Sequence, residues 1–180
     1  MCTVENDQDM KIVGEVMPKK SREADTAESW VRHKNSGNID RAHRLGKMLA
    51  QQLLNIQDDD PAKLLQKQML FAFTVDAGAP VFLNDDLLVQ TARGTFFERL
   101  RTLLPSFEVT LHRLGAFTFY RLCLDNESEN ALPAEKLGTV FAALCGRAED
   151  PETEQEGTAL FRGYLARLEE TVGMVEFERI

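Results

Sequence analysis

The sequence predicts an all-α fold, a single-domain bundle of about six to seven helices. Three observations support this prediction. Apolar residues recur at helical spacing over most of the stretch 36–175. Prolines and glycines divide that stretch into segments of ordinary helix length. The composition, 43% hydrophobic and 28% charged over 180 residues, is that of a globular domain and excludes a wholly disordered chain.

Three regions are expected along the chain. Residues 1–35 form a loosely ordered N-terminal arm with a short helix, which must dock on the rest of the chain to persist. Trp30 is expected to anchor this arm, because an exposed indole forfeits its large gain from burial. Residues 36–175 form the bundle domain. Residues 176–180 form a C-terminal tail, and the surrounding run MVEFERI is interpreted as a docking arm or a short strand.

The first helix of the bundle runs from about Asn38 to residue 56. Its apolar or small residues follow each other at steps of 3, 4, 3, 4 and 3, which predicts one buried stripe: Ile39, Ala42, Gly46, Leu49, Leu53 and Ile56. Two of these residues, Ala42 and Gly46, are small. We therefore expect another helix to approach this end of the helix closely.

The next two helices are marked by prolines and aspartates. Asp60 is placed to N-cap a helix over about 61–76, which is apolar around most of its circumference and is expected to break at Gly78 and Pro80. Another helix is predicted from about residue 84 or 85 to residue 104, before Pro105.

The segment 107–124 is predicted as the central apolar helix of the bundle. Its apolar residues also alternate in places, so a hairpin turning at Gly115 is the alternative. A helix is favoured because a single glycine is a weak turn signal and both flanking segments are helical. Two further helices are expected, over about 132–145 and 151–172.

Charge and cysteine content restrict the functions. The net charge of −8 argues against nucleic acid as a partner, because phosphate binding needs clustered Lys and Arg. No run approaches the roughly 18 apolar residues of a membrane span, so no membrane association is expected. Three widely spaced cysteines and the lack of a visible export signal favour the cytoplasm. No phosphate loop, zinc-binding pattern or nucleophile motif occurs, and no cofactor is predicted.

Two speculative sites remain. On a continuous 107–124 helix, Arg113, Tyr120 and Arg121 share one face and could bind an anionic ligand, with His112 as a proton-transfer residue. A metal site is the second possibility, from residues spaced as pairs on two helix faces: Asp40, His43, Glu108 and His112. The ferritin-like Glu-x-x-His pattern is absent, so ordinary surface pairs are the favoured interpretation of these four residues.

The runs GAFTFYRLCL (115–124) and LCGRAEDPE (144–152) resemble small all-helical bacterial proteins of unknown function from anaerobic Gram-positive organisms. The resemblance covers about residues 60–175 and implies a helical fold without an activity. The favoured function is therefore a cytoplasmic protein-interaction or regulatory module without catalysis, acting on a protein partner or by self-association. The alternative is a small anionic-ligand binder or enzyme that uses the 107–124 helix face.

Overall fold

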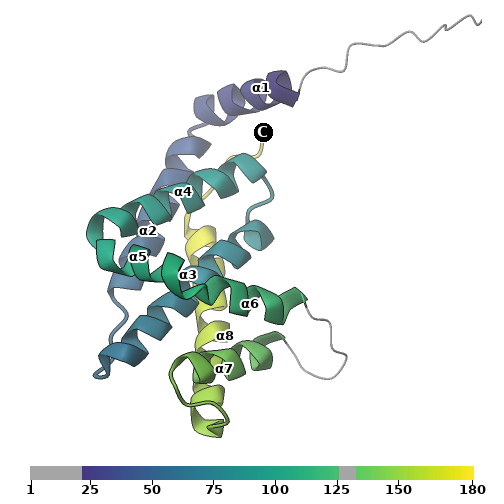
Figure 1. Cartoon of the computed structure of the whole chain (residues 1–180). Helices are drawn as coiled ribbons and strands as arrows, with labels where there is room; N and C mark the ends of the chain where they lie inside the picture. Colours follow the sequence, from purple (N-terminus) through teal and green to yellow (C-terminus); the bar gives the residue numbers. More distant parts are fainter. Residues whose placement is uncertain (1–21, 126–132) are drawn as a thin grey trace, which may run out of the picture.

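The computed structural model describes residues 22–125 and 133–180, and within these ranges every regular element is a helix. The all-α prediction is confirmed, with one helix more than expected (Figure 1). The helices are α1 (Arg22–Asn35), α2 (Asn38–Leu54), α3 (Pro61–Phe82), α4 (Asp86–Leu103), α5 (Pro105–Leu114), α6 (Ala116–Asp125), α7 (Pro133–Leu144) and α8 (Pro151–Met174). None of these helices has the length and apolar character needed to cross a bilayer.

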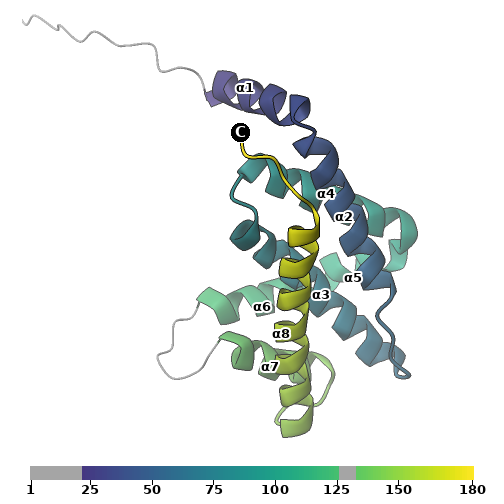
Figure 2. The ribbon, with the colours of Figure 1, turned by 180° about the vertical axis from the view of Figure 1, so that it is seen from behind.

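Helix α3 is the centre of the bundle. An unbroken run from Met69 to Asp76 is buried, so this helix meets protein on every side. It contacts α2, α4, α6, α7 and α8. In Figures 1 and 2, α8 lies on one side of the molecule and the α5–α6 pair lies on the other. Aromatic rings join these layers, because the ring of Phe71 lies 5.1 Å from that of Tyr164 and the ring of Phe73 lies 5.1 Å from that of Tyr120.

Helix α3 is longer than predicted. It begins as expected, with the Asp60 carboxylate accepting hydrogen bonds from the backbone of the first turn. It then continues through Gly78 and Pro80 to Phe82, so the predicted break is wrong. Gly78 is a packing position, since a Cβ there would lie 2.8 Å from a methyl carbon of Leu168 on α8. Tertiary packing on α8 therefore outweighs the local cost of one proline and one glycine.

The prediction of one central helix over 107–124 is wrong. The segment forms two ten-residue helices, α5 and α6, separated by Gly115 in the left-handed conformation (φ 59°). A residue without a Cβ adopts this conformation at little cost, which explains the break. The pair is peripheral, since Val109 is 45% exposed and Phe119 is 50% exposed. The alternative hairpin is also wrong, because both halves are helical.

The arm is described only from residue 22, and the short helix expected around residues 12–17 lies outside the described residues. The boundary at residue 35 stays a prediction. Trp30 on α1 is 43% exposed, with the Lys34 ammonium 4.7 Å from its ring centroid, so it is not the anchor. The anchor is His33, which is buried.

Helices α2 and α4 cross at a glycine. A Cβ on Gly46 would lie 2.4 Å from the carbonyl oxygen of Ala92 and 2.8 Å from the Cβ of Thr95. This close approach confirms the prediction made from the small residues of α2. The α7–α8 crossing repeats the arrangement, with Gly138 against the backbone of Glu154 and the side chain of Thr158.

We expect Gly46→Ala to lower the free energy of unfolding by about 2 kcal/mol, because the added methyl group meets the α4 backbone and cannot be accommodated by a rotamer change. Gly94→Ala on α4 is the matched control. Its Cβ would have no neighbour within 4 Å, so we expect a gain of up to about 1 kcal/mol from helix propensity. Urea denaturation measures both changes, and equal stability of the two variants would contradict this packing.

Candidate functional site

The segment 175–180, which is the predicted tail 176–180 with Val175 before it, docks beside the junction of α1 with α2 (Figure 2). We call this segment the tail. Val175 is buried and Phe177 is half-buried, whereas Glu176 and Glu178 are exposed. This alternation is that of an extended segment with one face against the protein. The predicted docking arm is therefore present, without strand pairing within the described residues.

Asn38, the first residue of α2, holds the main chain of the tail. Its Nδ2 donates to the carbonyl oxygen of Glu178 at 2.8 Å, and the amide N–H of Glu178 donates to its Oδ1 at 2.9 Å. Gly37 precedes it in the left-handed conformation (φ 75°) and makes the turn that brings α2 to the tail. The Asn38 side chain thus pairs with both polar backbone groups of one tail residue.

Every hydrogen-bonding position of the Asn38 amide is used. Its second Nδ2 proton points to Nδ1 of His33 at 3.4 Å, and its Oδ1 also accepts from the Arg41 guanidinium at 3.2 Å. An amide has two donor and two acceptor positions, so the group is saturated. Asn38 is completely buried, which makes an unfilled position costly. The Glu178 backbone also fixes which way the amide faces.

His33 links the tail to the start of α4. Its Nε2 lies 3.0 Å from Oδ2 of Asp85, and a carboxylate only accepts, so Nε2 carries the proton. In neutral His33, Nδ1 is then the acceptor that faces Asn38. The other oxygen of Asp85 accepts from the backbone N–H groups of Leu87 and Leu88 and caps α4.

The Asp85 carboxyl group is held as an anion. Partial burial acts to raise its pKa, but hydrogen bonds from the Leu88 and Leu87 backbone and from His33 outweigh burial and lower it. The carboxylate is therefore a permanent acceptor for both α4 and His33.

We call the cleft that receives the tail the tail groove. It is bounded by the α1–α2 junction and by the connection from α3 to α4. A cavity of about 410 Å³ beside the tail is lined by His33, Phe82, Leu83, Asn84, Asp85, Leu88 and residues 177–180. At its rim, Arg41 pairs with the Glu178 carboxylate at 2.9 Å. The groove combines main-chain hydrogen bonds, apolar contacts at alternate tail positions and one cation, which are the elements of extended-peptide recognition.

The predicted anion-binding face stays a prediction. Arg113 lies on α5, whereas Tyr120 and Arg121 lie on α6, so the one continuous helix that it assumed is divided at Gly115. The Tyr120 side chain is fully buried, and burial raises the pKa of its hydroxyl. Arg121 donates to Oδ2 of Asp76 at 2.5 Å. The side chains of His112 and Arg113 lie outside the described residues.

The Asp76 carboxylate is a structural ion-pair centre. It is 5% exposed on α3 and receives hydrogen bonds from Arg93 of α4 and Arg121 of α6. A buried carboxylate needs such partners to remain charged. Arg121 therefore links α6 to α3 through Asp76, although its side chain is 58% exposed.

The metal hypothesis remains a prediction in part. Asp40 and His43 line an open groove of about 670 Å³ between α2 and α4, where His43 Nδ1 lies 2.7 Å from Oγ1 of Thr95. The described residues contain no group of three His, Cys, Asp or Glu side chains placed to bind a metal. The side chains of Glu108 and His112, the other predicted ligands, lie outside the described part.

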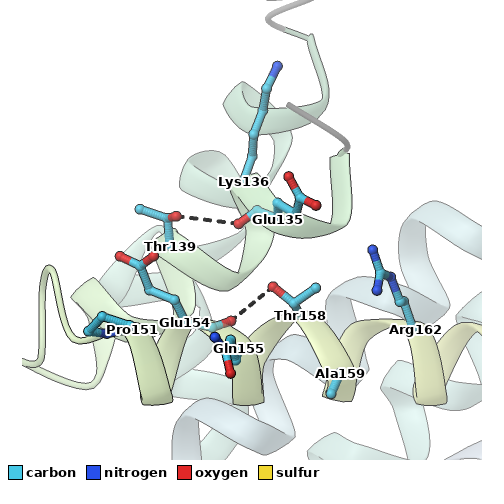
Figure 3. A pocket seen from close by; sticks show the side chains of 9 residues that line it. All are labelled: Glu135, Lys136, Thr139, Pro151, Glu154, Gln155, Thr158, Ala159 and Arg162. Atoms are coloured by element: carbon cyan, nitrogen blue, oxygen red, sulfur yellow. Dashed lines mark hydrogen bonds between the residues drawn. The ribbon is translucent and has the colours of Figure 1, made fainter. Parts of the chain in front are cut away.

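A groove of about 680 Å³ lies between α7 and α8. The polar side chains that line it do not point toward a common position. Lys136 points away from α8, and the hydroxyls of Thr139 and Thr158 donate to the carbonyls of Glu135 and Glu154 (Figure 3). Both threonine hydroxyls thus donate to the carbonyl four residues earlier in their own helix. This groove follows from the close helix crossing and shows no convergent chemistry.

The described cysteines are free thiols and are half-buried. Burial raises the pKa of the Cys123 thiol, and burial raises that of Cys145 to about 11. A thiol with a raised pKa is protonated near neutral pH and is a poor nucleophile.

The sequence did not identify the residues that bind the tail. It indicated Asn38 only as the start of a predicted helix.

We expect Asn38→Ala to lower the free energy of unfolding by about 2 kcal/mol, because it removes four hydrogen bonds from a buried site. Amide hydrogen exchange at Glu178 should accelerate. Asn35→Ala is the matched control, since Asn35 is exposed at the end of α1, and its effect should stay within about 0.5 kcal/mol. Chemical denaturation and exchange NMR measure the two effects. Unchanged Glu178 exchange in Asn38→Ala would contradict the assignment.

Comparison with known proteins adds no relative: no family model, no curated protein and no solved structure matches this chain. The resemblance carried by residues 115–124 and 144–152 stays a prediction.

Proposed function

We propose that this chain is a protein-interaction or regulatory module without catalysis, and that the tail groove is its recognition surface. The observation that carries the proposal is the paired hydrogen bonding of Asn38 to the Glu178 backbone. These bonds use groups that every extended segment possesses. A segment of another protein can therefore replace the tail without loss of them.

The tail itself indicates the chemistry of such a segment. Its apolar residues, Val175 and Phe177, lie two positions apart and face the protein, and the exposed Glu178 pairs with Arg41. We therefore propose that the partner presents an extended segment with apolar residues at alternate positions followed by an acidic residue.

The tethered tail acts as a competitor for this partner. It is held at a high effective concentration by its own chain, so a free segment must bind well enough to displace it. The apparent affinity of the groove is reduced by the fraction of molecules whose groove is open. Release of the tail is then the step at which binding can be regulated.

The proposed setting is the cytoplasm, with a protein partner rather than nucleic acid or a membrane. The free thiols of Cys123 and Cys145 fit a reducing compartment, and the net charge of −8 opposes phosphate binding. A second copy of the chain carries the same tail, so self-association by tail exchange is the simplest form of this interaction. Light scattering across protein concentrations detects it.

A peptide-exchange experiment tests the proposal. In the full chain, Phe177→Asp places a charge in the apolar contact and should displace the tail. A fluorescent peptide with the sequence of residues 173–180 should then bind this variant at least about tenfold more tightly than the wild type, because the groove is open. Fluorescence anisotropy at about pH 8 gives the dissociation constants.

Two controls make the result specific. The same peptide carrying the Phe177→Asp change should not bind. Adding Asn38→Ala to the open variant should weaken binding of the unmodified peptide, because the main-chain hydrogen bonds are lost. Failure of the peptide to bind an open, folded variant, as judged by circular dichroism, overturns the proposed function.

A further inference from the structure

The Asn38 amide must satisfy two neighbours at once, the tail and His33. Toward the tail, the Glu178 N–H has to meet Oδ1 and the Glu178 carbonyl has to meet Nδ2. With Oδ1 committed to the tail, the side of the amide that faces His33 is the donor, Nδ2, at 3.4 Å from Nδ1. This arrangement works only while Nδ1 of His33 lacks a proton.

Protonation of His33 removes that compatibility. The new proton goes to Nδ1, because Nε2 already carries one and donates to Asp85. Two donors, Nδ1–H and Nδ2–H, then face each other in a site where Asn38 is fully buried and His33 is 4% exposed. Rotating the amide by half a turn restores the bond to His33, but it places Nδ2 against the Glu178 N–H and Oδ1 against the Glu178 carbonyl. One amide thus satisfies either the tail or the protonated imidazole.

The charges around His33 allow protonation in place. The Asp85 carboxylate remains bonded to Nε2 in both states and stabilises the imidazolium as an ion pair. The other charged groups adjacent to His33 in sequence or around the tail groove are Arg32 and Lys34 on α1, Arg41 on α2, and Glu178 and Arg179 in the tail. Arg41 is paired with the Glu178 carboxylate, so this ion pair is lost when the tail is released.

We infer that His33 is a proton-sensitive latch that holds the tail in the tail groove when neutral and releases it when protonated. Histidine is the side chain that ordinarily changes charge between about pH 5 and pH 8. The tail is therefore bound while the His33 imidazole is neutral and is freed when the imidazole is protonated. The release of the tail does not depend on the proposed function. Only its consequence does, namely that mild acidification opens the tail groove to a partner.

Backbone NMR of the full chain tests the latch. The heteronuclear NOE of the Glu178 amide should match that of α8 at about pH 8 and should fall to the value of a free chain end by about pH 5.5. His33→Gln keeps an N–H donor toward Asp85 and cannot be protonated, so its Glu178 signal should not change with pH. His43→Gln, an exposed histidine on the same helix as Asn38, is the matched control and should retain the wild-type response.

Glu178→Gln separates the latch from titration of the tail carboxylate. This variant keeps the backbone bonds to Asn38, so it should still release its tail on acidification. A pH response that persists unchanged in His33→Gln, or that disappears in Glu178→Gln, overturns the latch. A wild-type tail that stays ordered at about pH 5.5 also overturns it. Peptide exchange at about pH 8 tests the proposed function separately.

Discussion

The requirement that α3 be buried on all sides governs this structure. A helix whose residues 69–76 are all inaccessible to water needs neighbours around its whole circumference, and α2, α4, α6, α7 and α8 supply them. No single neighbour covers enough of its surface. The peripheral helices can accordingly be short, because each covers only one side of α3. The order of the chain then places the end of α8 next to the start of α2.

Asp76, the one buried carboxylate among the described residues, joins α3 to two of its neighbours. Asp76 accepts hydrogen bonds from Arg93 on α4 and Arg121 on α6. A single buried carboxylate therefore links three helices by ion pairs. Shape alone is a weaker constraint, since apolar side chains of similar size can repack. The ion pair with Asp76 also explains why Arg121 occurs within the otherwise apolar sequence of α6.

Local patterns were sufficient to predict the helices that have one buried stripe. The aspartate cap of α3 and the close α2–α4 crossing depend on neighbours in sequence, and both predictions are confirmed. The predicted stripe of α2 is correct for Ala42, Gly46, Leu49 and Leu53, whereas Ile39 and Ile56 are only half-buried and Ile56 follows the helix. The central helix was not. Two segments of the chain are rich in apolar residues, and composition does not reveal which is enclosed. Burial of α3 depends on where five other helices lie. The second segment is divided at Gly115, which adopts a left-handed backbone conformation.

The candidate site could not be predicted from local sequence patterns, because its residues are far apart in the chain. Asn38 and Glu178 are 140 residues apart, and neither lies in a motif. The alternating apolar residues of the tail did indicate docking, but they carry no information on the receiving surface. His33 was overlooked because Trp30, the larger side chain nearby, was expected to be the buried one. Hydrogen-bond saturation of a buried amide becomes visible only when the fold has placed every partner.

The Asn38–Glu178 contact closes a loop that contains most of the described chain. Closing so long a loop costs more chain entropy than forming any helix–helix contact between neighbours in sequence. The contact should consequently form after the helices have assembled, when folding has already brought the two positions near each other. It should also open before the helices separate in the native state, since it is made by one short segment outside the helices. The part of the molecule that completes the fold is thus the part that can leave it without unfolding the rest.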